Sequence, residues 1–265
     1  MAIEVFNRNE GKFLIDKDVY EAINIKLLGY MELDAYNKTH DFYTISNIYY
    51  DTKDNYLIRN SLSKPQYKEK LRLRAYGVPA VDDKVYLEIK KKFNGLVNKR
   101  RTSLILNDAY EFLSTGEKPK LESYMNKQVI NEIDYFLKLY NVEPKLYLAY
   151  DRKAMFGKEN REVRITFDTN IRTRRYDLKL EAGDYGEPLL DNDKWLMEVK
   201  AEKNIPFWLS KLLSEYKIYK TSFSKYGKEY EKMLIKNKNL KGEMNKCLIQ
   251  YSAHYLTQQL VPKSL

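Results

Sequence analysis

The chain has 265 residues, of which 47 are Lys or Arg and 37 are Asp or Glu, so its formal net charge is +10 at pH 7. A surplus of this size predicts an anionic partner such as nucleic acid, a phosphate compound or acidic lipid. With 2 His and 1 Cys, a disulfide framework, a zinc ribbon and nearly all His-rich metal centres are excluded. Any chemistry must therefore use carboxylates, Lys, Arg and Tyr, with or without a hard metal ion.

The distribution of apolar residues predicts a soluble, cytoplasmic protein. No stretch approaches the length of apolar sequence that a membrane-spanning helix requires. The first residues, MAIEVFNRNEGKF, lack the basic start and apolar core of a signal peptide. Gly and Pro are scattered singly rather than gathered in linkers. We expect one domain over residues 1–236, followed by a C-terminal helical extension over residues 237–265.

In chain order, alternation of polar and apolar residues predicts strands, and helical spacing predicts helices between and after them. The strands are expected at 8–15, 43–51, 67–76, 85–92, 97–106, 145–153, 161–169, 171–180 and 195–202. Helices are expected at 17–30, 108–114, 122–140, from Pro206 to about Lys217, and at 224–236 and 243–260. This order is typical of an α+β fold. About eight strands can close an antiparallel β-barrel around one small ligand.

Four predicted strands carry a Glu two residues before a Lys or Arg, at Glu10/Lys12, Glu88/Lys90, Glu162/Arg164 and Glu198/Lys200. Residues two apart in a strand share a face. One interpretation is a solvated face with cross-strand ion pairs. However, these faces consist almost entirely of Lys, Arg, Glu and Tyr, and the opposite faces are apolar. We therefore expect a closed barrel tunnel with a charged lumen, whose apolar outside is covered by helices.

A lumen rich in cations predicts a polyanionic ligand, because unpaired cations in an enclosed space repel one another. Lys and Arg bind the non-bridging oxygens of phosphate groups, and Arg does so with two planar contacts. Carboxylates would repel phosphate but are suitable ligands for Mg²⁺ or Mn²⁺. Phosphoryl transfer needs positioning and charge neutralisation, without His or Cys. The pattern therefore favours metal-assisted phosphoryl chemistry.

An ordered set of motifs resembles the vacuolar transporter chaperone (VTC) polyphosphate polymerase domain, within the triphosphate tunnel metalloenzymes. The motifs are RNEGKF (8–13), SNIYYDT (46–52), KLRLRAYG (70–77), VYLEIKKK (85–92), VNKRR (97–101), YDRKAMFG (150–157), REVRITFDT (161–169), KWLMEVK (194–200) and TSFSKYG (221–227). The resemblance covers roughly residues 7–235. It implies a polyphosphate polymerase that passes the ATP γ-phosphate to a growing polyphosphate chain inside the tunnel. Its partners would be ATP and polyphosphate, with no nucleic acid.

The resemblance also implies a role for individual residues. Four basic residues would bind the reacting phosphates and act in catalysis: Arg72, Arg74, Arg164 and Lys200. Eight residues would bind substrate: Lys12, Lys90, Lys99, Arg101, Tyr150, Arg152, Ser224 and Lys225. Glu198 would be the main ligand of Mn²⁺ or Mg²⁺, and Glu10, Glu88 and Glu162 would be further ligands of metal or water.

One departure from the wider group affects the expected reaction. That group opens with Glu-x-Glu-x-Lys, and here Arg8 stands at the first Glu. This argues against a second metal that supports hydrolysis and favours the polymerase. A metal-dependent triphosphatase, polyphosphatase or nucleoside triphosphatase, and a non-catalytic polyanion-binding module, remain the alternatives.

Overall fold

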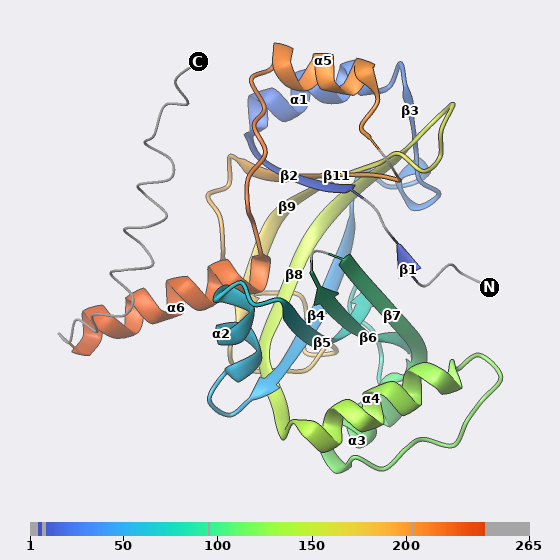
Figure 1. Cartoon of the computed structure of the whole chain (residues 1–265), viewed down its shortest axis with the longest axis vertical. Helices are drawn as coiled ribbons and strands as arrows, with labels where there is room; N and C mark the ends of the chain where they lie inside the picture. The colour runs from blue at the N-terminus through green and yellow to red at the C-terminus, as the bar shows by residue number, and fades with distance from the viewer. Residues whose placement is uncertain (1–4, 7–8, 95, 203, 242–265) are drawn as a thin grey trace. The chain divides into compact units, whose positions relative to one another are not determined.

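The computed structural model describes residues 5–6, 9–94, 96–202 and 204–241 (Figure 1). The chain divides into two compact units, Met1–Lys228 and Glu229–Leu265. Within the second unit, the described residues continue helix α6 (Lys225–Lys241). The predicted helix at 243–260 lies outside the described residues, and the predicted domain boundary after residue 236 stays a prediction.

The first unit is built on one antiparallel sheet of 11 strands. Its order is β1-β7-β6-β5-β4-β8-β9-β11-β2, with β10 beside β9 and β3 beside β8. The strands are β1 (Val5–Phe6), β2 (Asn9–Asp16), β3 (Met31–Leu33), β4 (Tyr43–Thr52), β5 (Tyr67–Tyr76), β6 (Lys84–Phe93), β7 (Leu96–Ile105), β8 (Val142–Gly157), β9 (Arg164–Arg174), β10 (Glu187–Pro188) and β11 (Lys194–Ala201). Figure 1 shows the long, bent strands β8 and β9 joining the β2–β11 end of the sheet to the β4–β7 end.

The sheet is not closed, so the prediction of a closed barrel was wrong, whereas the α+β class is confirmed. The strands at the two ends of the order, β1 and β2, follow each other in the chain. Within the described ranges, no ladder joins them. Instead, the described residues of β1 pair with β7, and those of β2 pair with β11. The result is a curled, open sheet.

Helices cover one face of this sheet at both ends. They are α1 (Lys17–Leu27), α2 (Tyr56–Leu62), α3 (Leu106–Thr115), α4 (Lys127–Leu139), α5 (Phe207–Glu215) and the short 3₁₀ helix η1 (Tyr36–Lys38). α4 begins later than the predicted residue 122 because Asn126 caps it, accepting hydrogen bonds from the backbone N–H groups of Gln128 and Val129. Among the described residues, each helix is too short or too polar to cross a bilayer.

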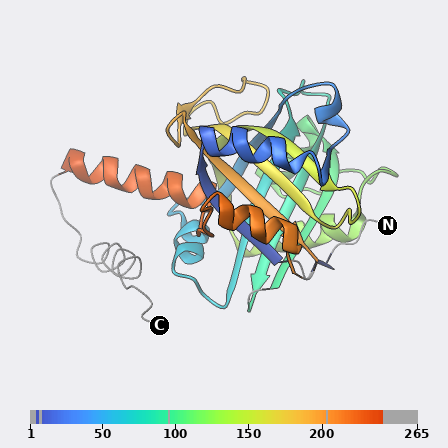
Figure 2. The same cartoon turned by 90° about the horizontal axis from the view of Figure 1, so that it is seen from above.

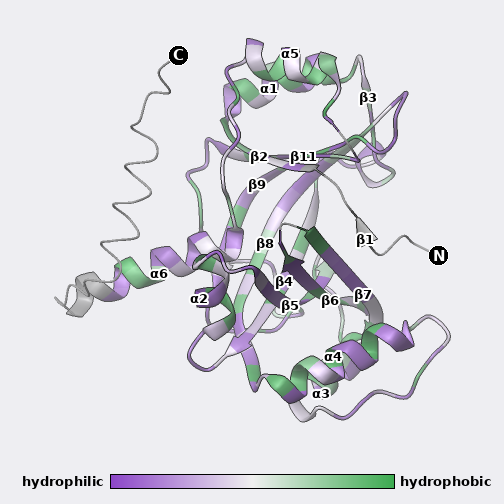
Figure 3. Ribbon diagram, in the orientation of Figure 1, coloured by the Kyte–Doolittle hydropathy of each residue, from purple (hydrophilic) through white to green (hydrophobic). Residues whose placement is uncertain are grey.

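Two hydrophobic clusters hold the helices against the sheet. In the first, α3 and α4 pack on the outward face of β4–β8 through residues such as Leu71, Leu87, Phe112 and Phe136. In the second, α1 and α5 pack on β2, β9 and β11 through residues such as Phe13, Ile23, Phe167 and Leu209. Figures 2 and 3 show these helices lying on the sheet with apolar residues along them. Each fully buried side chain of this kind stabilises the fold by about 1.5–3 kcal/mol.

The opposite face of the sheet, called the inner face below, therefore carries the charged residues, as predicted. On β5, Leu71 and Leu73 are fully buried under the helices, and the alternate residues Arg72 and Arg74 point to the inner face. A slip of such a strand by one residue would move its apolar side chains to the other face. The sequence pattern thus determines which side chains of each strand face the inside of the curl.

One predicted strand boundary was wrong. Residues 158–163 form a turn, in which the backbone N–H of Val163 donates to the carbonyl of Asn160 and that of Gly157 donates to the carbonyl of Val163. β9 therefore starts at Arg164 and runs without a break to Arg174, in place of two predicted strands. Glu162, a predicted metal ligand, lies in this turn and is exposed.

Candidate functional site

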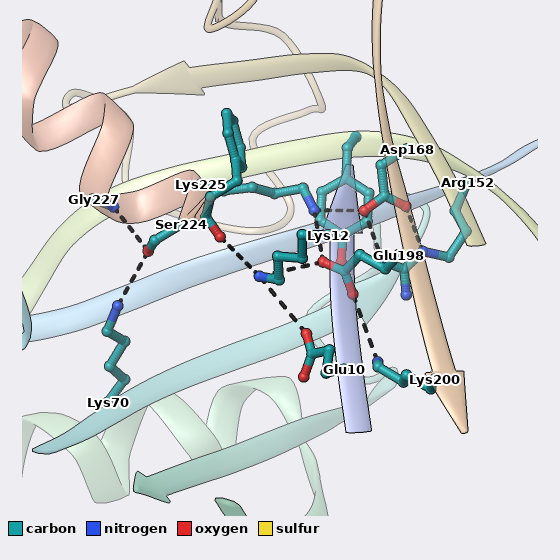
Figure 4. Close-up of polar contacts among 12 residues, drawn as sticks. Glu10, Lys12, Lys70, Arg152, Asp168, Glu198, Lys200, Ser224, Lys225 and Gly227 are labelled. Atoms are coloured by element: carbon teal, nitrogen blue, oxygen red, sulfur yellow. Dashed lines mark hydrogen bonds and ion pairs between the residues drawn. The ribbon is translucent and has the colours of Figure 1, made fainter. Parts of the chain in front are cut away.

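The inner face gathers several cations around one buried carboxylate, Glu198 on β11. Glu198 Oε1 lies 3.5 Å from Lys12 Nζ and 3.9 Å from Lys225 Nζ, and Oε2 lies 3.6 Å from Lys200 Nζ (Figure 4). Burial raises the pKa of Glu198, but the charges of Lys12, Lys225 and Lys200 outweigh burial and hold this pKa well below its usual range. Glu198 is therefore ionised.

The pairing of β2 with β11 builds this arrangement. Lys12 lies opposite Glu198, and Glu10 lies opposite Lys200. Residues directly opposite in an antiparallel pair share a face, so two acids and two bases alternate in a small square. Lys12 Nζ also lies 3.7 Å from Glu10 Oε1.

The two ends of the sheet face each other across the inner face. Burial raises the pKa of Glu10, but Lys90 on β6 is the strongest of the cations that lower it below its usual value. In turn, burial lowers the pKa of Lys90, and the negative charge of Glu10 raises it. β2 and β6 are far apart in the strand order, so this interaction acts across the curl of the sheet.

A second buried carboxylate, Asp168 on β9, holds two further cations. Arg152 donates from Nε to Oδ1 at 2.6 Å and from Nη2 to Oδ2 at 2.8 Å. Lys225 Nζ donates to Oδ2 and lies 4.3 Å from the ring centre of Tyr150. Burial raises the pKa of Asp168, but Arg152 and Lys225 lower it below its usual value. Asp168 was not among the predicted site residues, although the alternation of REVRITFDT places it on the same face as Arg164.

A third buried carboxylate, Glu88 on β6, orients three cations. Arg72 Nη2 lies 2.6 Å from Oε2, Lys99 Nζ lies 2.6 Å from Oε1, and Arg74 Nε lies 3.7 Å from Oε2. Burial raises the pKa of Glu88, but Arg74, Arg72 and Lys99 hold it well below its usual range. Glu88 was predicted as a ligand of metal or water. That role stays a prediction; in the structure its carboxylate contacts Arg72, Lys99 and Arg74.

Neutral side chains complete the orientation of the arginines. Arg72 Nη1 donates to the Tyr49 hydroxyl at 3.0 Å, and Arg74 Nε donates to Asn47 Oδ1 at 3.0 Å. Arg74 Nη2 donates to the Tyr150 hydroxyl at 3.2 Å. Tyr150 was predicted, whereas Asn47 and Tyr49 were not. The alternation of SNIYYDT could have identified both, because it places them on one face.

The segment TSFSKYG (221–227) runs along the inner face between β2 and β5 (Figure 4). Lys12 Nζ donates to the Phe223 carbonyl at 2.9 Å, and Lys70 Nζ donates to Ser224 Oγ at 3.3 Å. The backbone N–H of Thr221 donates to the Lys12 carbonyl at 2.7 Å. Ser224 was predicted to bind substrate, and here it contacts Lys70, a residue that sequence reasoning did not assign.

The inner face holds more positive charge than its carboxylates neutralise. Burial, reinforced by neighbouring cations, lowers the pKa of Lys70 to about 7. Burial and the two nearby arginines also lower the pKa of Lys99 to about 7, against the opposing effect of Glu88. Burial is likewise the main cause of the lowered pKa of Lys90 and of Lys200. Part of the Lys90 side chain is nevertheless exposed to solvent. A bound polyanion would favour the charged forms of these lysines and so raise their pKa.

Three predicted residues lie at the margin of this cluster or outside it. Arg101 is exposed, and its guanidinium lies 4.7 Å from the ring centre of Tyr86. Arg164 is in register with Lys200, and its Nε atom is buried with no hydrogen bond in the described part of the chain. Glu162 lies outside the cluster, in the turn before β9.

The carboxylates fit a divalent ion only when a ligand completes its coordination. In the ranges that the structure describes, no group of three or more Asp, Glu, His or Cys could hold a metal. Glu10 and Glu198, which both approach Lys12, supply two hard oxygen donors. Mg²⁺ is commonly bound by one or two carboxylates together with substrate phosphates and water. The donor set therefore suits an ion that is shared with a phosphate ligand.

Two solved structures are similar to this chain in their fold. A solved structure from Bacillus halodurans, a candidate adenylate cyclase, is similar with a TM-score of 0.52 and 15% identity, covering 84% of this chain and 96% of that chain. A candidate adenylyl cyclase from Hippeastrum, described as having a dominant triphosphatase activity, gives a TM-score of 0.48 and 13% identity, covering 89% and 97%. The first likeness shows the fold alone.

No match is found among curated proteins. The model of the VTC domain matches residues 7–234, which is most of the chain and includes every strand from β2 onward. The chain therefore belongs to the VTC domain family.

Proposed function

We propose that the inner face transfers the γ-phosphate of ATP to the end of a growing polyphosphate chain. Membership of the VTC domain family supports this function. The observation that carries it is the convergence of Lys12, Lys200 and Lys225 on Glu198 inside a curled sheet. A face with surplus cations inside this curl suits a substrate and a product that are both polyanions.

The arginines are held ready to bind phosphate before substrate arrives. Glu88 orients Arg72, Asn47 orients Arg74, and Asp168 orients Arg152. These fixed guanidinium groups would contact the non-bridging oxygens of the triphosphate with little loss of conformational freedom. Lys200, Lys90 and Arg164 would bind further non-bridging oxygens of the triphosphate.

A divalent ion, Mn²⁺ or Mg²⁺, would be held by Glu198 and Glu10. When bound, it would neutralise the phosphate charges that the side chains leave uncompensated. Lys12 approaches both carboxylates. Lys12 is the strongest of the cations that lower the pKa of Glu198, and Lys90 is the strongest of those that lower the pKa of Glu10.

The proposed step involves no protein nucleophile. A terminal phosphate oxygen of the acceptor chain forms a bond to the γ-phosphorus of ATP. The bond from that phosphorus to the oxygen bridging it to the β-phosphate breaks, and ADP leaves with the electron pair. The chain grows by one phosphate, and the side chains contribute by aligning donor and acceptor.

Products distinguish this function from hydrolysis. The protein is incubated with ATP and Mn²⁺, and the products are resolved on a gel. Long chains support the polymerase, orthophosphate alone identifies a triphosphatase, and binding without turnover under any divalent ion identifies a polyanion-binding module. Arg8 at the position of the first Glu of the tunnel motif favours the first outcome.

Two variants connect the activity to the site. Lys200→Gln removes one cation beside Glu198, and we expect the rate of chain synthesis to fall by at least about 100-fold. Lys26→Gln removes a cation of the same kind from the exposed face of α1 and serves as the control. Equal rates in the two variants would reject the assignment of the site.

A further inference from the structure

One buried group on the inner face is a neutral hydroxyl among many charges. Thr166 lies on β9 and is 1% exposed. The residues before and after it, Ile165 and Phe167, pack under the helices in the second hydrophobic cluster. Because side chains alternate along a strand, Thr166 points to the inner face. In the described part of the chain, its hydroxyl oxygen has no hydrogen-bond partner.

The groups around Thr166 are apolar or already paired with cations. On β8, Thr166 lies opposite Ala154, whose side chain is a methyl group. On β11, it lies opposite Glu198, whose two carboxylate oxygens form ion pairs with three lysines. Two residues further along β9, the oxygens of Asp168 accept hydrogen bonds from two other cations. Both neighbouring carboxylates are therefore engaged by cations.

A buried hydroxyl without a partner is unfavourable for the protein in its ligand-free form. Burial removes the hydrogen bonds that the hydroxyl makes with water, and this costs free energy unless another group replaces them. Val has a side chain of nearly the same shape, carries no polar atom and is equally suited to a strand. The presence of Thr at this position therefore indicates a ligand that satisfies the hydroxyl.

A second polar group on the same strand indicates the same ligand. Arg164 shares the face of Thr166, and its buried Nε atom makes no hydrogen bond within the ranges that the structure describes. On the other side of Thr166, Arg152 on β8 lies opposite Asp168. Residues two apart in a strand are separated by about 7 Å. The Thr166 hydroxyl thus lies between two arginines, which are the side chains best suited to bind phosphate oxygens.

We propose that the Thr166 hydroxyl donates a hydrogen bond to a non-bridging oxygen of a phosphate group that lies between Arg164 and Arg152. The proposal rests on the proposed function for the identity of the anion. Phosphate oxygens without a proton only accept, so the hydroxyl is the donor. A hydrogen bond depends on direction, whereas the attraction between two charges depends on their distance. Thr166 therefore orients a phosphate group that the surrounding cations attract.

The test measures the binding of inorganic tripolyphosphate to the full chain by titration calorimetry without metal. Thr166→Val removes the hydroxyl and keeps the shape of the side chain. We expect its affinity to fall about 10- to 100-fold, because a hydrogen bond to a charged group is lost. Thr166→Ser keeps a hydroxyl and should recover most of the affinity.

The salt dependence of binding separates this contact from those of the cations. Salt screens charges, and the group lost in Thr166→Val is neutral. The loss of affinity in this variant should therefore be the same at low and at high salt. In Lys200→Gln, which removes a charge, the loss should become smaller at high salt.

Thr102→Val is the matched control. Thr102 is also buried on a strand, but its hydroxyl oxygen accepts a hydrogen bond from the backbone N–H of Asn126 at 2.9 Å. This variant should have a lower melting temperature and an unchanged affinity for tripolyphosphate. Thr166→Val should show the opposite pattern, with a melting temperature of the ligand-free protein equal to that of the wild type or higher.

Three results would overturn the contact. They are a wild-type affinity in Thr166→Val, an equal loss of affinity in Thr102→Val, and a lower melting temperature in Thr166→Val without recovery of affinity in Thr166→Ser. A loss that arises only when Mn²⁺ is added would overturn it as well and assign the hydroxyl to the ion. A wild type that binds tripolyphosphate through Thr166 but makes no polymer from ATP would instead reject the polymerase and support the contact.

Discussion

Arg152 and Asp168 form a two-pronged ion pair across β8 and β9, with hydrogen bonds of 2.6 and 2.8 Å and both side chains buried. Removing one partner of such a pair leaves the other buried and uncompensated, which costs about 3–5 kcal/mol. Lys225 shares the same carboxylate, so Asp168 stabilises two cations of the site at once.

We therefore expect Asp168→Asn to lower the free energy of unfolding by about 3 kcal/mol, as measured by urea denaturation. Inorganic tripolyphosphate should restore part of this loss, because it supplies the missing negative charge. Asp54→Asn is the control, since Asp54 is an exposed carboxylate that pairs with Arg59; the anion should stabilise this variant only as much as it stabilises the wild type. A loss in Asp168→Asn that the anion leaves unchanged would show that Asp168 is purely structural.

The lysines with lowered pKa values make stability depend on pH. Lys70 and Lys99 have a pKa of about 7 in the folded protein and an ordinary value of 10.5. Between these values the unfolded chain binds more protons, so stability rises with pH. The ligand-free protein should have a higher melting temperature at pH 9 than at pH 7.

Bound tripolyphosphate should flatten this dependence, because an anion beside Lys70 and Lys99 raises their pKa in the folded state. Lys70→Gln should have a weaker pH dependence than the wild type without ligand. The measurement is thermal unfolding at pH 7, 8 and 9 with and without the anion. A melting temperature that falls over this range in the ligand-free wild type would contradict the interpretation.

Binding should take up protons for the same reason. Near pH 8, tripolyphosphate should cause a net proton uptake, measured by calorimetry in buffers of different ionisation enthalpy. Lys99→Gln should reduce the uptake by up to about one proton, and the control Lys26→Gln should not change it. Identical apparent enthalpies in all buffers would exclude a linkage between the anion and these lysines.

Glu198 provides a test of the metal site. In Glu198→Gln, we expect the Mn²⁺-dependent rate to fall by at least about 100-fold. Without metal, tripolyphosphate should bind this variant at least as tightly as the wild type, because a negative charge has been removed from beside Lys12 and Lys200. Weaker metal-free binding would instead show that Glu198 serves to hold the cations in position.

Much of the inner face could be predicted from the sequence, because strand alternation alone assigns side chains to faces. Lys12, Arg72, Lys90 and Lys200 were assigned in this way, and their faces depend only on a period of two. The partners of each charge depend on which strands become neighbours. Arg152 on β8 lies opposite Asp168 on β9. No local sequence pattern predicts that Asp168 is the carboxylate that pairs with Arg152.

The errors also have physical causes. Glu162 follows the strand alternation in the sequence, but Asn160 accepts a hydrogen bond from the backbone N–H of Glu162 through its side chain and fixes a turn there. Closure of the barrel requires a ladder between the first and last strands of the sheet. In the described part of the chain β1 pairs with β7 and β2 pairs with β11, and the number of predicted strands does not reveal whether the two edge strands pair with each other.

The last prediction concerns the Tyr76 end of the inner face. Tyr76→Ala removes the exposed ring that stacks with Tyr36, and a lost base stack costs about 1–3 kcal/mol of binding. The variant should therefore bind ATP about 5- to 100-fold more weakly while its affinity for tripolyphosphate, which has no base, stays unchanged. Tyr135→Ala removes an exposed ring from the outward-lying α4 and is the control. If Tyr76→Ala weakens both ligands equally, the ring supports the fold of β5 and the nucleoside lies elsewhere. If neither affinity changes, the Tyr76 ring does not contact the nucleoside.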